Sequence, residues 1–189
     1  MRLVDFADLT AAQTAEAARI LREAIPGPSY KQSGEAEQEV ARFFDNPDRF
    51  AIAALEGADP IGWVGGVRDY PTSLQLHPLV VDPPRHRRGV GRALVAALEA
   101  RALGEGYLAM HLGSDDEAGG TNLFEVDAFP DPLAKLAAIA PSPRGHAFFF
   151  YLKLGFTPVG IIPDANGFGR PDLLLSKRLG PTGKPPRPA

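Results

Sequence analysis

The segment from Leu79 to Leu103 constrains the fold more than any other part of the sequence. It begins as an apolar, partly β-branched run, turns through two prolines and four arginines, and passes Gly89 and Gly91 into a stretch with apolar residues at helical spacing. Gly104 closes that stretch as a helix C-cap would. The pattern predicts a strand, a glycine-containing turn and a helix in direct succession, which is typical of α/β folds.

The start of this helix is suited to binding an anion. The first backbone N–H groups of a helix have no partner within it, and they carry the positive end of its dipole. Glycine at positions 89 and 91 leaves these groups unobstructed. We expect the turn to hold a diphosphate, because a single phosphate would not need so wide a basic rim. That rim consists of Arg85, Arg87, Arg88 and Arg92.

Two common diphosphate-binding loops do not fit this segment. No Lys-Ser/Thr pair follows the second glycine, so a P-loop nucleotide hydrolase lacks its lysine and its magnesium-binding hydroxyl. Leu94 replaces the third glycine of the dinucleotide-binding fingerprint, and the loop follows a third or fourth strand instead of the first. The remaining structural alternative is a surface helix with solvated arginines.

The rest of the chain alternates helical and extended patterns. A run of about thirty residues, Ser114–Arg144, separates two apolar blocks. Connections in α/β proteins usually have roughly two to six residues. We therefore expect this long connection to have a functional role. Periodicity and turn residues predict helices at Ala11–Ile25, Ala36–Asn46, Gly89–Leu103, Pro132–Ile139 and His146–Leu154, and strands at Phe50–Leu55, Ile61–Val67, Leu74–Val81, Tyr107–Leu112, Thr157–Ile162 and Leu173–Ser176.

Composition limits the function classes. The 189 residues contain no cysteine, which excludes disulfides, thiolate metal sites and a cysteine nucleophile. The net charge of −3 argues against a dedicated nucleic-acid-binding protein. No apolar run is long enough for a membrane span and no signal peptide is visible, so we expect a cytoplasmic protein. We expect a single domain at residues 1–179 and a disordered tail at 180–189.

Several sequence blocks resemble one enzyme family. The glycine turn resembles motif A of the GNAT superfamily of N-acetyltransferases, Gln/Arg-x-x-Gly-x-Gly/Ala, with His86 at its first position. Five further blocks, in the same order, resemble the aminoglycoside 6′-N-acetyltransferases, over roughly Leu74–Arg178. They are His77–Val81, Leu112–Glu117, Val126–Asp131, His146 with Phe150–Phe156, and Pro163–Asp172.

The resemblance implies a fold and a co-substrate. The fold is the α/β (α+β) GNAT fold, a mixed sheet flanked by helices and splayed open between the Leu79 strand and the Tyr107 strand. The co-substrate is acetyl-CoA, and no metal is expected. The residues expected to bind it are Leu79, Val80 and Val81 along the pantetheine arm, and Arg87, Arg88, Gly89, Val90, Gly91 and Arg92 at the pyrophosphate.

The resemblance also implies catalytic groups. Acetyl transfer to an amine needs a neutral nucleophile, stabilisation of the carbonyl oxyanion and a proton for the departing thiolate. Tyr151 lies at the tyrosine position of the family and would donate that proton, although without the resemblance core packing is the more common role of an aromatic residue at this spacing. Several aminoglycoside enzymes have Glu where this chain has Gln75. An amide cannot accept a proton, so the base would be His77, Asp115 or water, and His77 could also be structural.

An acidic acceptor site would complete the enzyme. Carboxylates near a basic co-substrate site favour an amine acceptor, although each one could also belong to a solvated acidic face. The leading function is acetylation of an aminoglycoside 6′-amine; the alternatives are another polyamine, a protein amine, or an inactive acyl-CoA-binding regulatory module. The family suggests a homodimer, and no nucleic-acid or membrane partner is expected. The candidate acceptor residues are Gln75, Asp115, Asp116, Glu117, Asp164 and Asp172.

Overall fold

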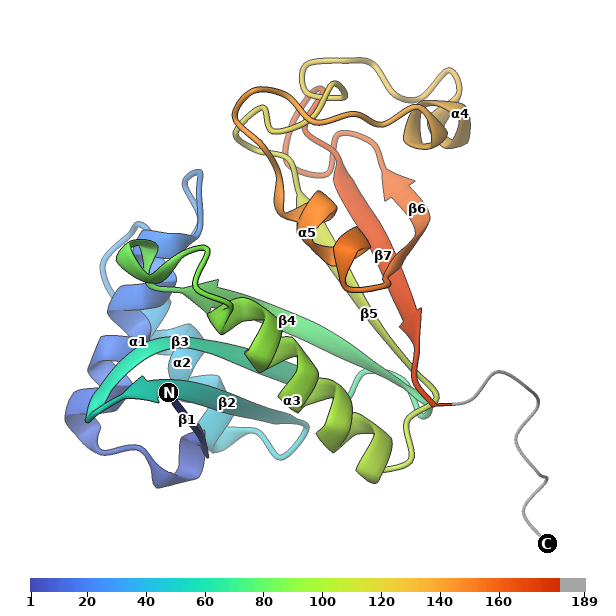
Figure 1. Ribbon diagram of the computed structural model, residues 1–189. Coiled ribbons are helices and arrows are strands. Elements are labelled where there is room, and N and C mark those ends of the chain that lie inside the picture. The colour runs from blue at the N-terminus through green and yellow to red at the C-terminus, as the bar shows by residue number, and fades with distance from the viewer. Residues whose placement is uncertain (181–189) are drawn as a thin grey trace, which may run out of the picture.

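The computed structural model describes residues 1–180, in which one seven-stranded sheet carries helices on both faces (Figure 1). The strand order is β1-β2-β3-β4-β5-β7-β6, and only the β4–β5 pair is parallel. The strands are β1 Arg2–Asp5, β2 Arg49–Glu56, β3 Asp59–Val67, β4 Ser73–Val81, β5 Ala109–Asp115, β6 Thr157–Ile162 and β7 Asp172–Arg178; the α-helices are α1 Ala11–Ala24, α2 Glu35–Asp45, α3 Val90–Gly104, α4 Pro132–Ala137 and α5 Ala147–Lys153.

The helices and strands predicted from periodicity are confirmed, with ends that shift by a few residues. The capping box predicted at Thr10 and Gln13 is present and begins α1. The sequence analysis missed β1, a four-residue edge strand whose first two residues are exposed. Its conformation is set by pairing with β2, because so short a segment shows no alternation of its own.

The sheet opens between its two central strands, as the resemblance implied. β4 and β5 pair only over Ser73–Gln75 and Ala109–His111. Beyond this point β4 stays with β3 and β5 stays with β7, so the two halves of the sheet diverge like the arms of a V (Figure 1). The rest of β4, up to Val81, therefore has one edge free of strand pairing.

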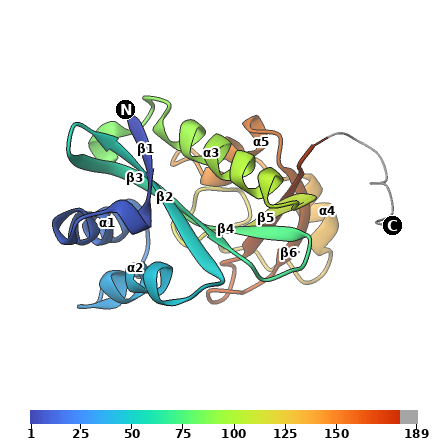
Figure 2. The same cartoon turned by 90° about the horizontal axis from the view of Figure 1, so that it is seen from below.

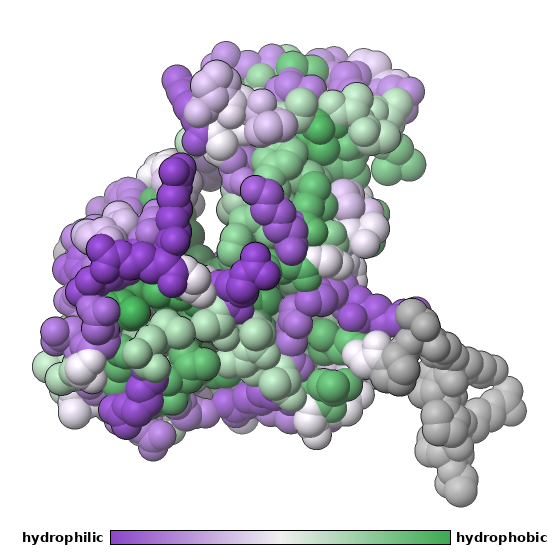
Figure 3. All heavy atoms as spheres, in the orientation of Figure 1, coloured by the Kyte–Doolittle hydropathy of each residue, from purple (hydrophilic) through white to green (hydrophobic). Residues whose placement is uncertain are grey.

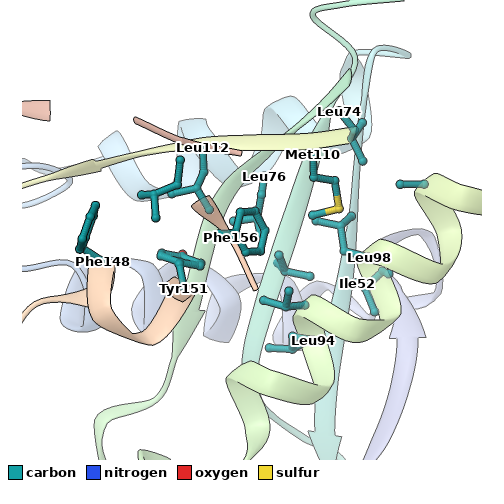
Figure 4. Close-up of a cluster of buried hydrophobic side chains, with 14 of the residues drawn as sticks. Ile52, Leu74, Leu76, Leu94, Leu98, Met110, Leu112, Phe148, Tyr151 and Phe156 are labelled. Atoms are coloured by element: carbon teal, nitrogen blue, oxygen red, sulfur yellow. The ribbon is translucent and has the colours of Figure 1, made fainter. Parts of the chain in front are cut away.

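Two cores cover opposite faces of the sheet. Leu94 and Leu98 of α3 and Phe148 of α5 pack on one face against alternate residues of β4 and β5. Figure 4 shows this cluster, which includes Tyr151. On the other face α1 and α2 pack around Trp63, whose Nε1 donates to the carbonyl of Ala17. Figure 2 shows α1 and α2 on the side of the sheet away from α3, so the second face is left without a helix beyond β4.

Among residues 1–180, every helix is too short or too polar to cross a bilayer. The tail expected to be disordered lies outside the described residues from position 181 onward. The prediction that residues 1–179 form one domain stays a prediction, although a single sheet joins both halves of this range.

Candidate active site

The turn before α3 leaves the first backbone amides of the helix without a side-chain cap. Gly89 is the N-cap of α3, with φ of +83°, and no side chain caps the helix there. A Cβ at this position would meet nothing within 4 Å, so the approach to the first amides is open. Glycine is needed because a left-handed N-cap strains other residues. A Cβ at Gly91 would stand 3.3 Å from the tip of the Phe150 ring, so α5 packs close to the first turn of α3.

Three of the four arginines of this turn are exposed. Arg87, Arg88 and Arg92 form no ion pair or side-chain hydrogen bond with any residue in the described range. Arg85 is different, because its guanidinium pairs with Glu56 at 2.5 Å. On this face hydrophilic side chains lie beside the gap between the two halves of the molecule, and the facing wall of the gap is largely hydrophobic (Figure 3). The uncapped helix start and three unpaired guanidinium groups are the kinds of donor that suit a phosphorylated ligand.

His86 has a structural role that the motif did not indicate. Its Nε2 lies 2.8 Å from the carbonyl oxygen of Val81, at the end of β4. The amide of the next residue, Asp82, donates to Ile61 of β3, so the carbonyl of Val81 points to the opposite, unpaired edge. The imidazole therefore occupies one acceptor on the free edge of β4.

Tyr151 lies on α5 between the two arms of the sheet. Its ring packs against Phe150 and Phe156, with centroid distances of 5.3 and 5.6 Å, and only 7% of the residue is exposed. Burial raises the pKa of the Tyr151 phenol well above its usual value. The group therefore stays protonated over the physiological pH range and can only act as a hydrogen-bond or proton donor to an anion.

A hollow of about 270 Å³ opens on the opposite face of the sheet, beside the divergence of β4 and β5. The alternate residues of these strands that point away from α3 and α5 line it, together with side chains of β7 and β6. Its lining contains two carboxylates and no lysine or arginine. The lining side chains include Gln75, His77, His111, Asp115, Val159, Asp172 and Leu174.

The two carboxylates of this hollow come from paired strands. Asp115 of β5 lies opposite Asp172 of β7. The carboxylate of Asp172 lies over Gly113, where a Cβ would stand 2.5 Å from Oδ2, so the absence of a side chain there makes room for it. Burial is the main cause that raises the pKa of Asp172 to about 6, and the negative charge of Asp115 is the second. Hydrogen bonds from the backbone amides of Ser114 and Leu173 act in the opposite direction.

His77 reaches the hollow from β4 and contacts α2 as well. Its Nε2 lies 3.4 Å from the Tyr30 hydroxyl and 3.8 Å from Oε1 of Glu39. Glu39 is buried and accepts hydrogen bonds from Arg42 and Arg49. Loss of solvent lowers the pKa of His77, while the nearby Glu39 carboxylate opposes that effect. The imidazole is thus held on one side by a fixed polar cluster.

Comparison with known proteins assigns this arrangement to a family. The family model for GNAT acetyltransferases matches residues 16–125. The chain belongs to the acetyltransferase (GNAT) family. The enzyme class expected from the sequence is thereby confirmed, and a P-loop hydrolase is excluded.

Two solved structures similar to this acetyltransferase are aminoglycoside 6′-N-acetyltransferases. One, solved with coenzyme A, is 31% identical with a TM-score of 0.89. Another, from Enterococcus faecium, is also 31% identical, with a TM-score of 0.85. In both cases the alignment covers 97% of this chain and 100% of the other. A search of curated proteins gave no match.

The acetyltransferase fold brings only some of the predicted acceptor residues together. Three of them, Gln75, Asp115 and Asp172, line the hollow. Glu117 lies near Asp115. Burial raises the pKa of the Glu117 carboxyl, and the negative charge of Asp115 raises it further. Asp164 instead accepts a hydrogen bond from the backbone of Gly169 and shapes its own loop.

Asp116 requires a correction. It is fully buried, and its two oxygens accept hydrogen bonds from the amides of Gly120 and Thr121 and from the Thr121 hydroxyl, at 2.7 to 2.9 Å. A carboxylate with this many internal donors has no face left for an amine. The expectation that Asp116 binds the acceptor is therefore not retained, because the residue folds the connection after β5.

Sequence reasoning missed several groups around the hollow. His111 lines it, with Nδ1 2.9 Å from Ser73 and Nε2 2.9 Å from Asp69. Glu39 is remote in sequence, and only the packing of α2 on the sheet places it near His77. A signal was available for His111, since it lies in the strand Tyr107–Leu112, on the same face as Gly113 and Asp115.

Proposed function

We propose that this acetyltransferase transfers the acetyl group of acetyl-CoA to the 6′-amine of an aminoglycoside. The observation that carries the proposal is the placement of opposite charges at one opening of the sheet. Unpaired arginines and bare helix amides lie on the face of α3, while Asp115 and Asp172 lie in a hollow on the other face. An anionic donor and a cationic acceptor fit such an arrangement.

The donor side fits acetyl-CoA. The amides of Val90 and Gly91 and the guanidinium groups of Arg87, Arg88 and Arg92 would hold its pyrophosphate. The free edge of β4 between Leu79 and Val81 would bind its pantetheine amides by strand-like hydrogen bonds, with His86 at the end of that edge. When bound, acetyl-CoA supplies an activated acyl thioester. Tyr151 would donate a proton to the thiolate that leaves.

The acceptor side fits a polycationic amine. The hollow carries no cationic side chain to compete with a substrate ammonium group, and Glu117 extends the acidic lining toward the loop at Gly27. The similar enzymes are named for aminoglycosides, which supports this class over other amines. Gln75 leaves another polyamine or a protein amine as the alternative acceptor.

Thiol release tests the proposal directly. With acetyl-CoA and kanamycin or tobramycin, we expect amine-dependent release of coenzyme A, and mass spectrometry of the product should show one added acetyl group at the 6′ position. Spermidine and a peptide with a free N-terminus serve as comparison acceptors. Faster acetylation of either comparison amine, with none of the aminoglycosides, would reject the assigned acceptor.

The arginine rim should contribute to donor affinity. Each of Arg88→Ala and Arg92→Ala should weaken acetyl-CoA binding about three- to tenfold, because each removes one exposed, charge-assisted contact. Arg85→Ala is the matched control, since Arg85 already pairs with Glu56. Calorimetry at two salt concentrations would measure the affinities, and the wild-type affinity should fall with salt. Equal affinities for all four proteins would remove the arginines from the site.

The cytoplasmic location and the homodimer expected from the sequence stay predictions.

A further inference from the structure

One buried carboxylate oxygen in residues 1–180 lacks the hydrogen-bond partner that the other buried side-chain polar atoms of this range have. Oδ1 of Asp172 is buried and has no hydrogen-bond partner, and it is the only such atom in this range. Buried polar atoms are normally paired, because an unpaired one costs free energy. An exception at the lining of a hollow calls for a functional explanation.

The two buried carboxylates of the described range show what the partly buried Asp172 lacks. Glu39 has two arginines, and Asp116 has three internal donors. The charged or titratable groups that line the hollow with Asp172 are Asp115 of β5, His111 of β5 and His77 of β4, while β6 contributes none. Asp115 already accepts a hydrogen bond from Asn166 at 2.6 Å. Asp172 therefore faces a second carboxylate and no fixed cation.

We propose that Asp172 binds the ammonium group of the acceptor and takes its proton. The inference rests on the proposed function and deepens it. One N–H bond breaks and its proton moves to the Asp172 carboxylate, whose Oδ2 lies over Gly113 at the lining of the hollow. The electron pair left on nitrogen then forms the C–N bond to the acetyl carbon while the C–S bond of the thioester breaks, and the thiolate that leaves receives its proton from Tyr151. The second proton that the new amide nitrogen loses passes through solvent and restores the Tyr151 phenol, and the proton on Asp172 is released to solvent.

The neighbouring groups are less suited to this step. Gln75 has no proton-accepting side chain at neutral pH. Nε2 of His77 is shared between Tyr30 and Glu39. The pKa of Asp172 near 6 makes it a stronger base than an ordinary carboxylate while leaving it ionised at neutral pH, which is the range that general-base catalysis requires.

Asp172→Asn keeps the shape of the side chain and removes the base. We expect kcat/KM for the acceptor at neutral pH to fall about 10²-fold, with acetyl-CoA affinity unchanged. In the wild-type enzyme kcat/KM should decline below a pH of about 6, and this decline should be absent in the variant. Asp45→Asn, an exposed change on α2, is the matched control and should alter neither quantity.

Thermal unfolding separates a catalytic role from a structural one. A carboxyl whose pKa is higher in the folded than in the unfolded state destabilises the fold once both states are ionised. This penalty grows as the pH rises from about 4 to about 6, so Asp172→Asn should have a higher Tm than wild type at neutral pH and no advantage in acid. A structural carboxylate would give the opposite change.

The possible failures are distinguishable. A wild-type enzyme that acetylates no amine in the panel overturns the proposed function and this inference together. An active wild type whose Asp172→Asn variant keeps its rate and its acid limb overturns the inference alone, and so does a lower Tm of the variant at neutral pH. If the variant does not fold, a wild-type profile with no decline near pH 6 overturns the inference without it.

Discussion

Tyr151→Phe is expected to lower kcat about 10²-fold or more while acetyl-CoA affinity stays unchanged. The substitution removes a single hydroxyl from a ring that packs against Phe150 and Phe156, so the core contacts remain. Since burial keeps the phenol protonated, its loss removes a proton donor and leaves no ionised group behind. General acid catalysis contributes about this much in enzymes of known mechanism. Steady-state kinetics and calorimetry measure the two quantities.

Tyr107→Phe is the control for this experiment. Tyr107 is a tyrosine that is only partly buried, and it lies in the turn after α3, away from α5. If Tyr151→Phe turns over as fast as this control, the hydroxyl has no catalytic role and Tyr151 is a packing residue. A parallel fall in kcat and in acetyl-CoA affinity would instead indicate that the ring positions the donor.

Asp116→Ala is expected to destabilise the fold by about 3 kcal/mol. The substitution leaves the buried amides of Gly120 and Thr121 and the Thr121 hydroxyl without their acceptor, and each unpaired buried group costs about 1–3 kcal/mol. The connection that carries α4 and leads to α5 would lose its anchor. Urea denaturation followed by circular dichroism gives the free energy of unfolding.

Asp115→Ala is the matched control one residue away. Asp115 is exposed and accepts only one side-chain hydrogen bond, from Asn166, so its replacement should change the free energy of unfolding little. Its effect should appear in the acceptor KM, since Asp115 lines the hollow. Equal stability of both variants would contradict the anchoring role of Asp116 and return it to the list of acceptor residues.

Sequence periodicity predicted the strands and helices well where they are long or clearly amphipathic. The anion-binding turn at Gly89 could also be predicted from the sequence, because the first backbone N–H groups of any helix lack a partner within it. β1 could not be predicted from the sequence, because the conformation of this four-residue edge strand depends on its pairing with β2. The spacing of Asp115 and Asp116 likewise gave no indication that one is exposed and the other buried.

The sequence by itself determined the family, the order of the elements and the anion-binding turn, because these depend on local spacing and on matched blocks. The tertiary structure decided the acceptor site. Asp115 and Asp172 are far apart in the chain and face each other only through the β5–β7 register, and the absence of any cation beside Asp172 is a property of the whole hollow. Burial and charge environment are sums over neighbours from many segments, and no local pattern specifies them.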